Sequence, residues 1–246
     1  LYIFCGDELL CARLRPSNID GAAGSVEELE WIVSRIRTAW PQVKIILRGD
    51  SGFCREDIIS WCEAPENNID YLFGLAKNNR LIKEIEDELE EAKIMFECSG
   101  LPARRFKDFW YETLNSWSKS RRVVGKAEQL AGRSNPRFIV TSLSKEEYDA
   151  MSLYEDIYCA RGDMENRIKE KQLMLFADRT SSAKMRANQL RLYFSSIAYV
   201  LMQTLRRVGL TGTKMAKAQC ETIRLKLFKI GAQVRITVRK IWFAYA

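Results

Sequence analysis

Apolar and polar positions alternate along the first hundred residues in short blocks. Residues 1–15 place two apolar segments on either side of the turn pair Gly6-Asp7, which predicts a hairpin. A helix is predicted to begin at Ser25, because Ser25 and Glu28 have the spacing of a capping box. Apolar residues then recur at helical spacing until Pro41 ends the pattern: Leu29, Ile32, Val33, Ile36 and Trp40.

Two further apolar runs predict buried strands at residues 43–47 and 69–77, with a short helix at 55–64 between them. The order is strand, strand, helix, strand, helix, strand. This order indicates an α/β fold with a mixed sheet.

The pattern changes in the second half of the chain. Residues 79–95 predict a charged helix, and residues 100–143 predict strands rich in aromatic residues and Arg. From Lys145 onward the pattern is helical, including a basic amphipathic segment at 214–240. Residues 183–208 have the period of a buried helix, with this apolar stripe: Leu190, Phe194, Ile197, Leu201 and Leu205.

Composition narrows the class of protein. With 246 residues and 47% apolar residues the chain can bury a sizeable core, and no run approaches the length of a membrane span. It has no signal peptide and no initiator Met, and it starts within a strand pattern. We therefore expect a fragment of a longer protein.

Charge is unevenly distributed. The net charge is +7, yet residues 84–91 are acidic. Residues 176–246 contain fourteen Lys or Arg against Asp178 and Glu221. A basic region of this kind favours a polyanionic partner, most simply nucleic acid, over a solvated helix face.

Cysteine and histidine usage limits the chemistry. The seven cysteines are scattered without a CxxC pair, which favours reduced thiols in a cytosolic protein over disulfides or a zinc site. Histidine is absent, so Ser-His-Asp, Cys-His and His-metal sites are excluded. Carboxylates that bind Mg²⁺ or Mn²⁺ are then the leading candidates for catalysis.

Asp50 is the first candidate carboxylate. It follows the predicted strand 43–47 in the segment "KIILRGDSGFCRE" (44–56), where it is either a metal ligand at a strand end or an ordinary turn residue. Local sequence favours the turn.

A predicted helix at 154–172 holds the second candidate. Tyr158, Arg161, Glu165, Lys169 and Gln172 share one stripe at spacings of three or four residues. Exposed ion pairs explain such a stripe equally well, although nearby apolar residues predict that part of it is buried. Because Arg161 and Lys169 bracket Glu165, we choose Glu165 over Asp163 as the functional acid.

The segments 44–56 and "YCARGDMENRIKEKQLMLFADRTSS" (158–182) together resemble the DDE transposases of bacterial insertion sequences. The match is to the group-1 DDE family, which is related to transposases with a Tyr-Arg-Glu-Lys signature, and it extends over essentially the whole chain. The resemblance implies a ribonuclease-H-like fold and two Mg²⁺ or Mn²⁺ ions held by three carboxylates. It implies that Asp50 is the second Asp of the triad and Glu165 the terminal Glu.

The sequence departs from the family pattern at two places. The signature lysine is expected seven residues after the Glu, where this chain has Gln172, so Lys169 and Lys171 are the substitutes. The first Asp of the triad has no counterpart, because Asp7 and Asp20 lie in a turn and a loop. We therefore expect an N-terminally truncated chain that does not cleave transposon ends alone.

The resemblance also predicts the organisation of the chain and its contacts with DNA. The ribonuclease-H-like core spans 1–99 and 144–182, a β-rich insertion spans 100–143, and a basic helical region spans 183–246. Tyr158, Arg161, Lys169 and Lys171 are predicted DNA contacts on the helix. In the insertion, interleaved Arg and Trp suit phosphates and unpaired bases, although each Trp fits a small β core as well: Arg104, Arg105, Trp110, Trp117, Arg121 and Arg122.

Partners and location follow from the same resemblance. The expected partner is DNA, both the transposon ends and the target, bound by a homodimer in a synaptic complex. The expected location is the bacterial cytoplasm. A non-catalytic DNA-binding or oligomerising remnant of a transposase is the alternative.

Overall fold

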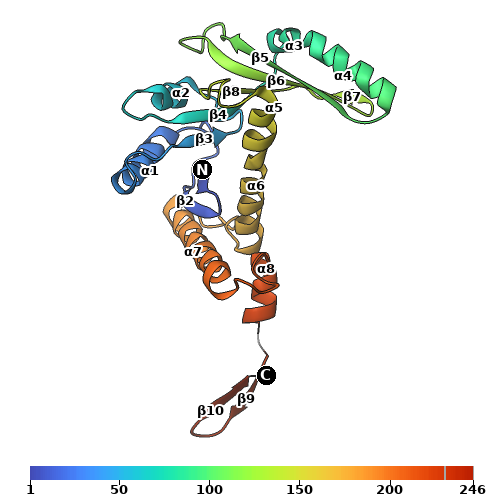
Figure 1. Cartoon of the computed structure of the whole chain (residues 1–246). Coiled ribbons are helices and arrows are strands. Elements are labelled where there is room, and N and C mark those ends of the chain that lie inside the picture. Colours follow the sequence, from blue (N-terminus) through green and yellow to red (C-terminus); the bar gives the residue numbers. More distant parts are fainter. Residues whose placement is uncertain (230, 246) are drawn as a thin grey trace. The chain divides into compact units, whose positions relative to one another are not determined.

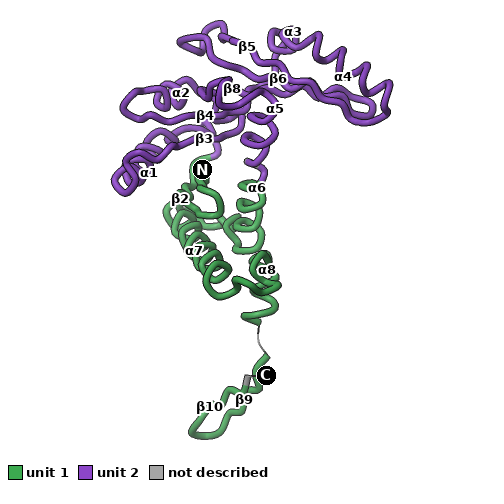
Figure 2. The backbone as a smooth tube through the Cα atoms, in the orientation of Figure 1, with its two compact units in different colours: residues 1–16, 163–246 green, residues 17–162 purple. Residues whose placement is uncertain are grey.

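The computed structural model describes residues 1–229 and 231–245, with the side chains of Arg161 and Tyr245 left out. The chain forms two compact units (Figure 2). One unit contains residues 17–162, and the other combines residues 1–16 with residues 163–246.

A mixed sheet forms the centre of the unit 17–162 (Figure 1). Its strands lie in the order β3-β4-β8-β6-β5, and the short β7 pairs with β6. The β3–β4 pair is parallel, and the other pairs are antiparallel. The strands are β3 (Ile46–Gly49), β4 (Asp70–Leu75), β5 (Ala103–Tyr111), β6 (Arg121–Leu130), β7 (Arg133–Ser134) and β8 (Arg137–Thr141).

Helices pack around this sheet. α4 contacts β5 and β6, α2 contacts both β4 and α1, and the helical segment after β8 closes one part of the core. That part consists of Leu72, Val124, Ile139, Leu143, Leu153 and Tyr154. The helices are α1 (Ser25–Ala39), α2 (Glu56–Glu63), α3 (Asn79–Glu84), α4 (Glu86–Ser99), α5 (Ala150–Ser152), the π-helical turn η1 (Leu153–Tyr158) and the 3₁₀ turn η2 (Cys159–Arg161).

The other unit combines the N-terminal hairpin with helices from the C-terminal part. α7 packs on β2 through Ala12, Ala177 and Leu192. The elements are β1 (Tyr2–Cys5), β2 (Glu8–Ala12), α6 (Gly162–Lys169), η3 (Glu170–Met174), α7 (Met185–Thr204), η4 (Leu205–Gly209), α8 (Cys220–Ile223), η5 (Arg224–Phe228), β9 (Ala232–Ile236) and β10 (Ile241–Tyr245).

The predicted mixed α/β fold is confirmed, as are most elements of the first hundred residues. The N-terminal hairpin, α1, α2 and the strands β3 and β4 form where the hydrophobic pattern places them. The capping box at Ser25 is wrong. Gly24 is the N-cap and makes no side-chain cap, and the Ser25 hydroxyl is buried without a hydrogen-bond partner.

The strands of residues 100–143 continue the main sheet. β8 pairs with both β4 and β6, so the boundaries predicted at 99/100 and 143/144 fall within one continuous structure. Sequence spacing gave no information about this pairing, because β4 and β8 are more than sixty residues apart.

Two predictions for the C-terminal part are wrong. Residues 232–245 form the antiparallel hairpin β9–β10 instead of a helix, because alternating apolar residues at 234, 236, 241 and 243 fit a strand period of two. The helix at 183–208 is confirmed as α7 and η4, but its predicted buried stripe faces outward. Leu190, Phe194, Ile197 and Leu201 are 52–63% exposed.

Candidate functional site

Asp50 is presented by a tight turn at the carboxyl end of β3. Its Oδ1 accepts a hydrogen bond from the backbone N–H of Gly52 (2.8 Å), and its carbonyl accepts one from Phe53 (3.1 Å). The turn and the ligand interpretations are therefore compatible, because the turn holds an exposed carboxylate at the edge of the sheet. A carboxylate oxygen in this position is a suitable ligand for Mg²⁺.

Tyr158 lies beside the same turn. A Cβ added to Gly74 on β4 would lie 2.5 Å from the Tyr158 hydroxyl and 3.1 Å from the backbone N of Ser51. The Tyr158 hydroxyl and the Asp50 turn therefore both approach the bare backbone of Gly74. Tyr158 is half-buried and packs against the core cluster of this unit.

Arg48 fastens the end of β3 to the helical segment that contains Tyr158. Its Nη1 donates a hydrogen bond to the carbonyl of Ile157 (2.7 Å). Neither Arg48 nor Gly74 was among the predicted site residues. Gly74 had a recognisable signal, because a glycine inside an apolar strand often marks a close backbone approach.

Glu165 belongs to the other compact unit, the one formed by 1–16 and 163–246. It lies in the first turn of α6 and is exposed, as is Asp163. The single helical period behind the predicted stripe 158–172 does not continue evenly along this segment. A 3₁₀ turn precedes α6 and a π-helical turn follows it, and both change the number of residues per turn.

The buried carboxylate of this helical segment is Glu170. It pairs with Arg206 and accepts a hydrogen bond from the backbone N–H of Cys220 (2.6 Å). Burial acts to raise the pKa of Glu170, but these hydrogen bonds outweigh it and hold the pKa below its usual value. The arrangement joins η3 to η4 and α8, which indicates a structural role for this acid.

Lys169 and Lys171 have different surroundings. Lys169 is exposed, whereas Lys171 is fully buried. The ammonium of Lys171 donates to Ser196 Oγ (2.8 Å) and lies 4.4 Å from the ring centroid of Tyr2. Burial lowers the pKa of Lys171 to about 8. Of the two substitutes for the signature lysine, Lys169 is therefore the accessible one. The side chain of Arg161 lies outside the described residues.

Two of the arginines predicted to contact DNA are buried in the sheet. Arg121 bonds the carboxylates of Glu56 (2.7 Å) and Glu63 (2.9 Å), and its hydrogen bond lowers the pKa of Glu56 to about 2. Arg122 pairs with Asp108 and donates to the Leu143 carbonyl (2.7 Å). These contacts favour a packing role for both arginines.

The other residues of 100–143 that were predicted to contact DNA are partly buried and partly exposed. Trp117 is buried with its ring edge-on to Tyr111, which fits the interpretation as core. Trp110 is 73% exposed. Arg104 and Arg105 are exposed on β5, although both bond glutamates, Arg104 with Glu128 (2.6 Å) and Glu155 (2.9 Å) and Arg105 with Glu91 (2.9 Å).

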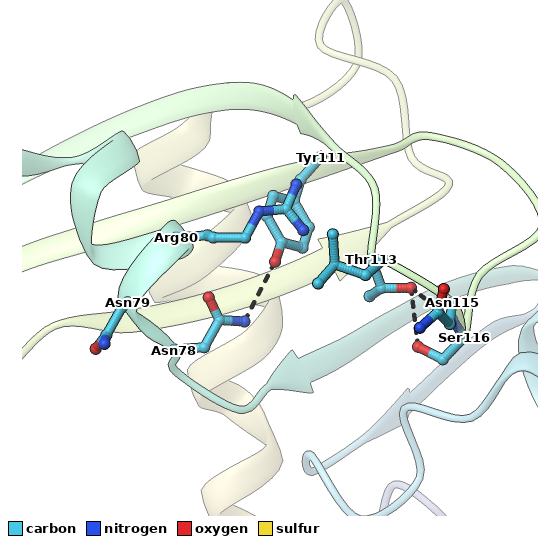
Figure 3. A pocket seen from close by; sticks show the side chains of 8 residues that line it. Asn78, Asn79, Arg80, Tyr111, Thr113, Asn115 and Ser116 are labelled. Atoms are coloured by element: carbon cyan, nitrogen blue, oxygen red, sulfur yellow. Dashed lines mark hydrogen bonds between the residues drawn. The ribbon is translucent and has the colours of Figure 1, made fainter.

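A shallow pocket of about 440 Å³ lies beside β5 (Figure 3). Asn78 donates to the Tyr111 hydroxyl (3.2 Å) at its wall, and the Arg80 guanidinium lies 5.0 Å from the Tyr111 ring centroid. The lining contains amides, hydroxyls and one arginine but no carboxylate, so it does not suit a divalent metal.

Within the described residues, no three or more Asp, Glu, Cys or His side chains gather as a metal site. Over the same residues no helix combines the length and the apolar character that a bilayer crossing requires. Asp50 lies in the unit 17–162, and Glu165 lies in the unit formed by residues 1–16 and 163–246.

The family model described as "Transposase DDE domain group 1" matches residues 1–246. A search of curated proteins finds no match.

Proposed function

The chain belongs to the family of transposases with a group-1 DDE domain, and from this membership we propose that it carries out DNA strand cleavage and strand transfer for a bacterial insertion sequence. The observation that best supports this function is the exposed carboxylate of Asp50, held by its turn at the end of β3 beside Tyr158. Mg²⁺ is commonly bound through one or two carboxylates together with waters and substrate phosphates.

Asp50 and Glu165 would hold Mg²⁺ or Mn²⁺, with two ions in the complete site. Bound metal of this kind activates the attacking oxygen and stabilises the leaving oxygen of a phosphoryl transfer. Both side chains are exposed and carry hard oxygen ligands, which suits either cation. The arrangement that we propose around them is ribonuclease-H-like.

The other side chains would bind and orient DNA. Lys169 and Trp110 are accessible for this purpose, and Arg104 and Arg105 can exchange a glutamate for a phosphate. Tyr158 would position the Asp50 turn, with Arg161 as a further contact. We place the chain in the bacterial cytoplasm, acting on transposon ends as a homodimer.

A DNA-binding or oligomerising protein without catalysis is the second candidate. It is favoured by the number of carboxylates assigned to the site, because Asp50 and Glu165 are two donors and the family resemblance implies three. The same experiment distinguishes the two functions.

The experiment joins precut 3′-hydroxyl duplexes, carrying the ends of the element, to a supercoiled plasmid in Mg²⁺ or Mn²⁺. We expect Asp50→Asn and Glu165→Gln each to lower joining by on the order of 10²-fold or more, as when transition-state charge loses its stabilisation. Asp57→Asn and Asp163→Asn are the matched controls, because both replace exposed acids on the same elements or beside them.

Equal activity in Asp50→Asn and wild type would contradict the assignment of the metal site. A wild-type chain that binds DNA but joins no strand in either metal would favour the second candidate. That result would also bear out the inactivity predicted from the sequence.

A further inference from the structure

α7 exposes a continuous apolar stripe along its outer face. The residues follow the three- and four-residue spacing of one helix face, and all are 42–74% exposed. This α7 stripe, which runs on into η4, consists of Leu190, Tyr193, Phe194, Ile197, Val200, Leu201 and Val208. It covers several hundred Å², at or above the largest patch of a typical monomer.

α7 cannot turn to bury this stripe within its own unit. Its opposite face is held by partly buried hydrogen bonds, from Ser195 Oγ to the Leu175 carbonyl (2.8 Å) and from the Tyr199 hydroxyl to the Asp7 carbonyl (3.0 Å). Rolling the helix would leave these polar groups unpaired and would separate Leu192 from Ala12. The exposed stripe is therefore the result of a fixed orientation.

The stripe is free of charge between residues 190 and 204, where Thr204 is the one polar position on that face. Two cations at its margins have other contacts, since Arg191 donates to Ser181 Oγ (3.0 Å) and Arg207 bonds Glu8 (3.2 Å). DNA requires cations at its contact surface, so this face does not suit it. A complementary apolar helix suits this face.

We propose that the occupant of the α7 stripe is the α7 stripe of a second copy of this chain. In an antiparallel pair centred on Ile197, Leu190 would face Thr204 of the second copy and Phe194 would face Val200. No like charges would oppose each other along this pairing, and the seven-residue repeat of 190, 197 and 204 provides the seam of a helix pair.

The size of the stripe agrees with this occupant. A stable interface buries about 800 Å² on each partner, which is the order of area that the seven side chains expose. The inference rests on the proposed homodimer and identifies its surface. It does not depend on the metal site.

The test measures the mass of the full chain by light scattering after gel filtration, without DNA, over a range of micromolar concentrations. We expect a dimer for wild type, and a monomer for Ile197→Glu and for Leu201→Glu. Leu173→Glu is the matched control, because Leu173 is 65% exposed in the same unit but away from the stripe. It should remain dimeric. Circular dichroism and thermal melting confirm that each variant is folded.

A monomeric wild type, or a dimer that Ile197→Glu leaves intact, would overturn the proposal. If the wild type is monomeric, thiol labelling of the Ile197→Cys variant, compared with labelling of the native cysteines in wild type, shows whether the stripe is covered. A protected Cys shows that another part of the same chain covers the stripe, and a reactive one shows that nothing does. Because DNA is absent, failure here is distinct from failure of strand joining.

Discussion

At the scale of single residues, Gly74 determines how closely two parts of the candidate site approach each other. Its missing side chain leaves room for the Tyr158 hydroxyl on one side and for the Asp50–Ser51 backbone on the other. The proposed function uses both the Tyr158 side chain and the turn that carries Asp50. The residue that permits their approach carries no chemistry of its own.

We predict that Gly74→Ala lowers the free energy of unfolding by about 1–3 kcal/mol, because the new Cβ must displace Tyr158 or the turn. Urea denaturation measures the loss. Gly21→Ala is the control, since a Cβ there has no atom within 4 Å. Adding Tyr158→Phe to Gly74→Ala removes the clashing hydroxyl and should recover part of the loss. Equal stability of Gly74→Ala and wild type would contradict the close approach.

At the scale of elements, the successive helical segments α6 and η3 contain two glutamates with opposite surroundings. Glu165 is exposed on α6, whereas Glu170 is buried in η3 beside Arg206. The π-helical turn at η3 widens the helix and alters which side chains turn inward. Five residues of sequence therefore separate a candidate ligand from a structural ion pair.

We predict that Glu170→Ala destabilises the chain by about 3–5 kcal/mol, because Arg206 would remain buried without its partner. Glu165→Ala should change the unfolding free energy little while it abolishes strand joining. The two measurements are urea denaturation and the joining assay. A reversal, with Glu165→Ala unfolding the protein and Glu170→Ala leaving it stable, would exchange the two roles.

At the scale of the whole molecule, charge is distributed unequally between the described units. The region from residue 176 to the end is strongly basic, whereas many cations of residues 17–162 are engaged with carboxylates. Arginines whose charge is already neutralised inside the sheet contribute little to a surface that binds phosphate. The exposed lysines of the C-terminal region are the better candidates.

We predict that DNA affinity falls steeply with salt, by about 10³-fold or more between 50 and 200 mM if six or more phosphates are contacted. Replacing the exposed Lys214 and Lys217 by Gln should reduce the slope of log K against log salt by up to about 2. Lys93→Gln, an exposed lysine near Glu90 on α4, is the control and should leave the slope unchanged. Binding insensitive to salt would exclude a phosphate-tracking surface.

The hydrophobic pattern determined much of this protein by itself. The turn pair Gly6-Asp7, short apolar runs and the 3.6-residue period identified the N-terminal hairpin, α1, β3, α2, β4 and α7, because these signals are local in the sequence. The absence of His removed whole classes of catalysis. The two segments around Asp50 and Glu165 carried the family resemblance that the family match confirmed.

Tertiary structure decided what those local patterns could not. Pairing β8 with β4 and β6 joined residues 100–143 to the main sheet, and ion pairs with partly buried carboxylates hold Arg121 and Arg122 inside it. The apolar period of α7 predicted a buried stripe, but partly buried hydrogen bonds fix the other face inward and leave that stripe exposed. Periodicity shows that a face is apolar, whereas the partner that covers it is determined by contacts between residues far apart in the chain, or in another copy of it.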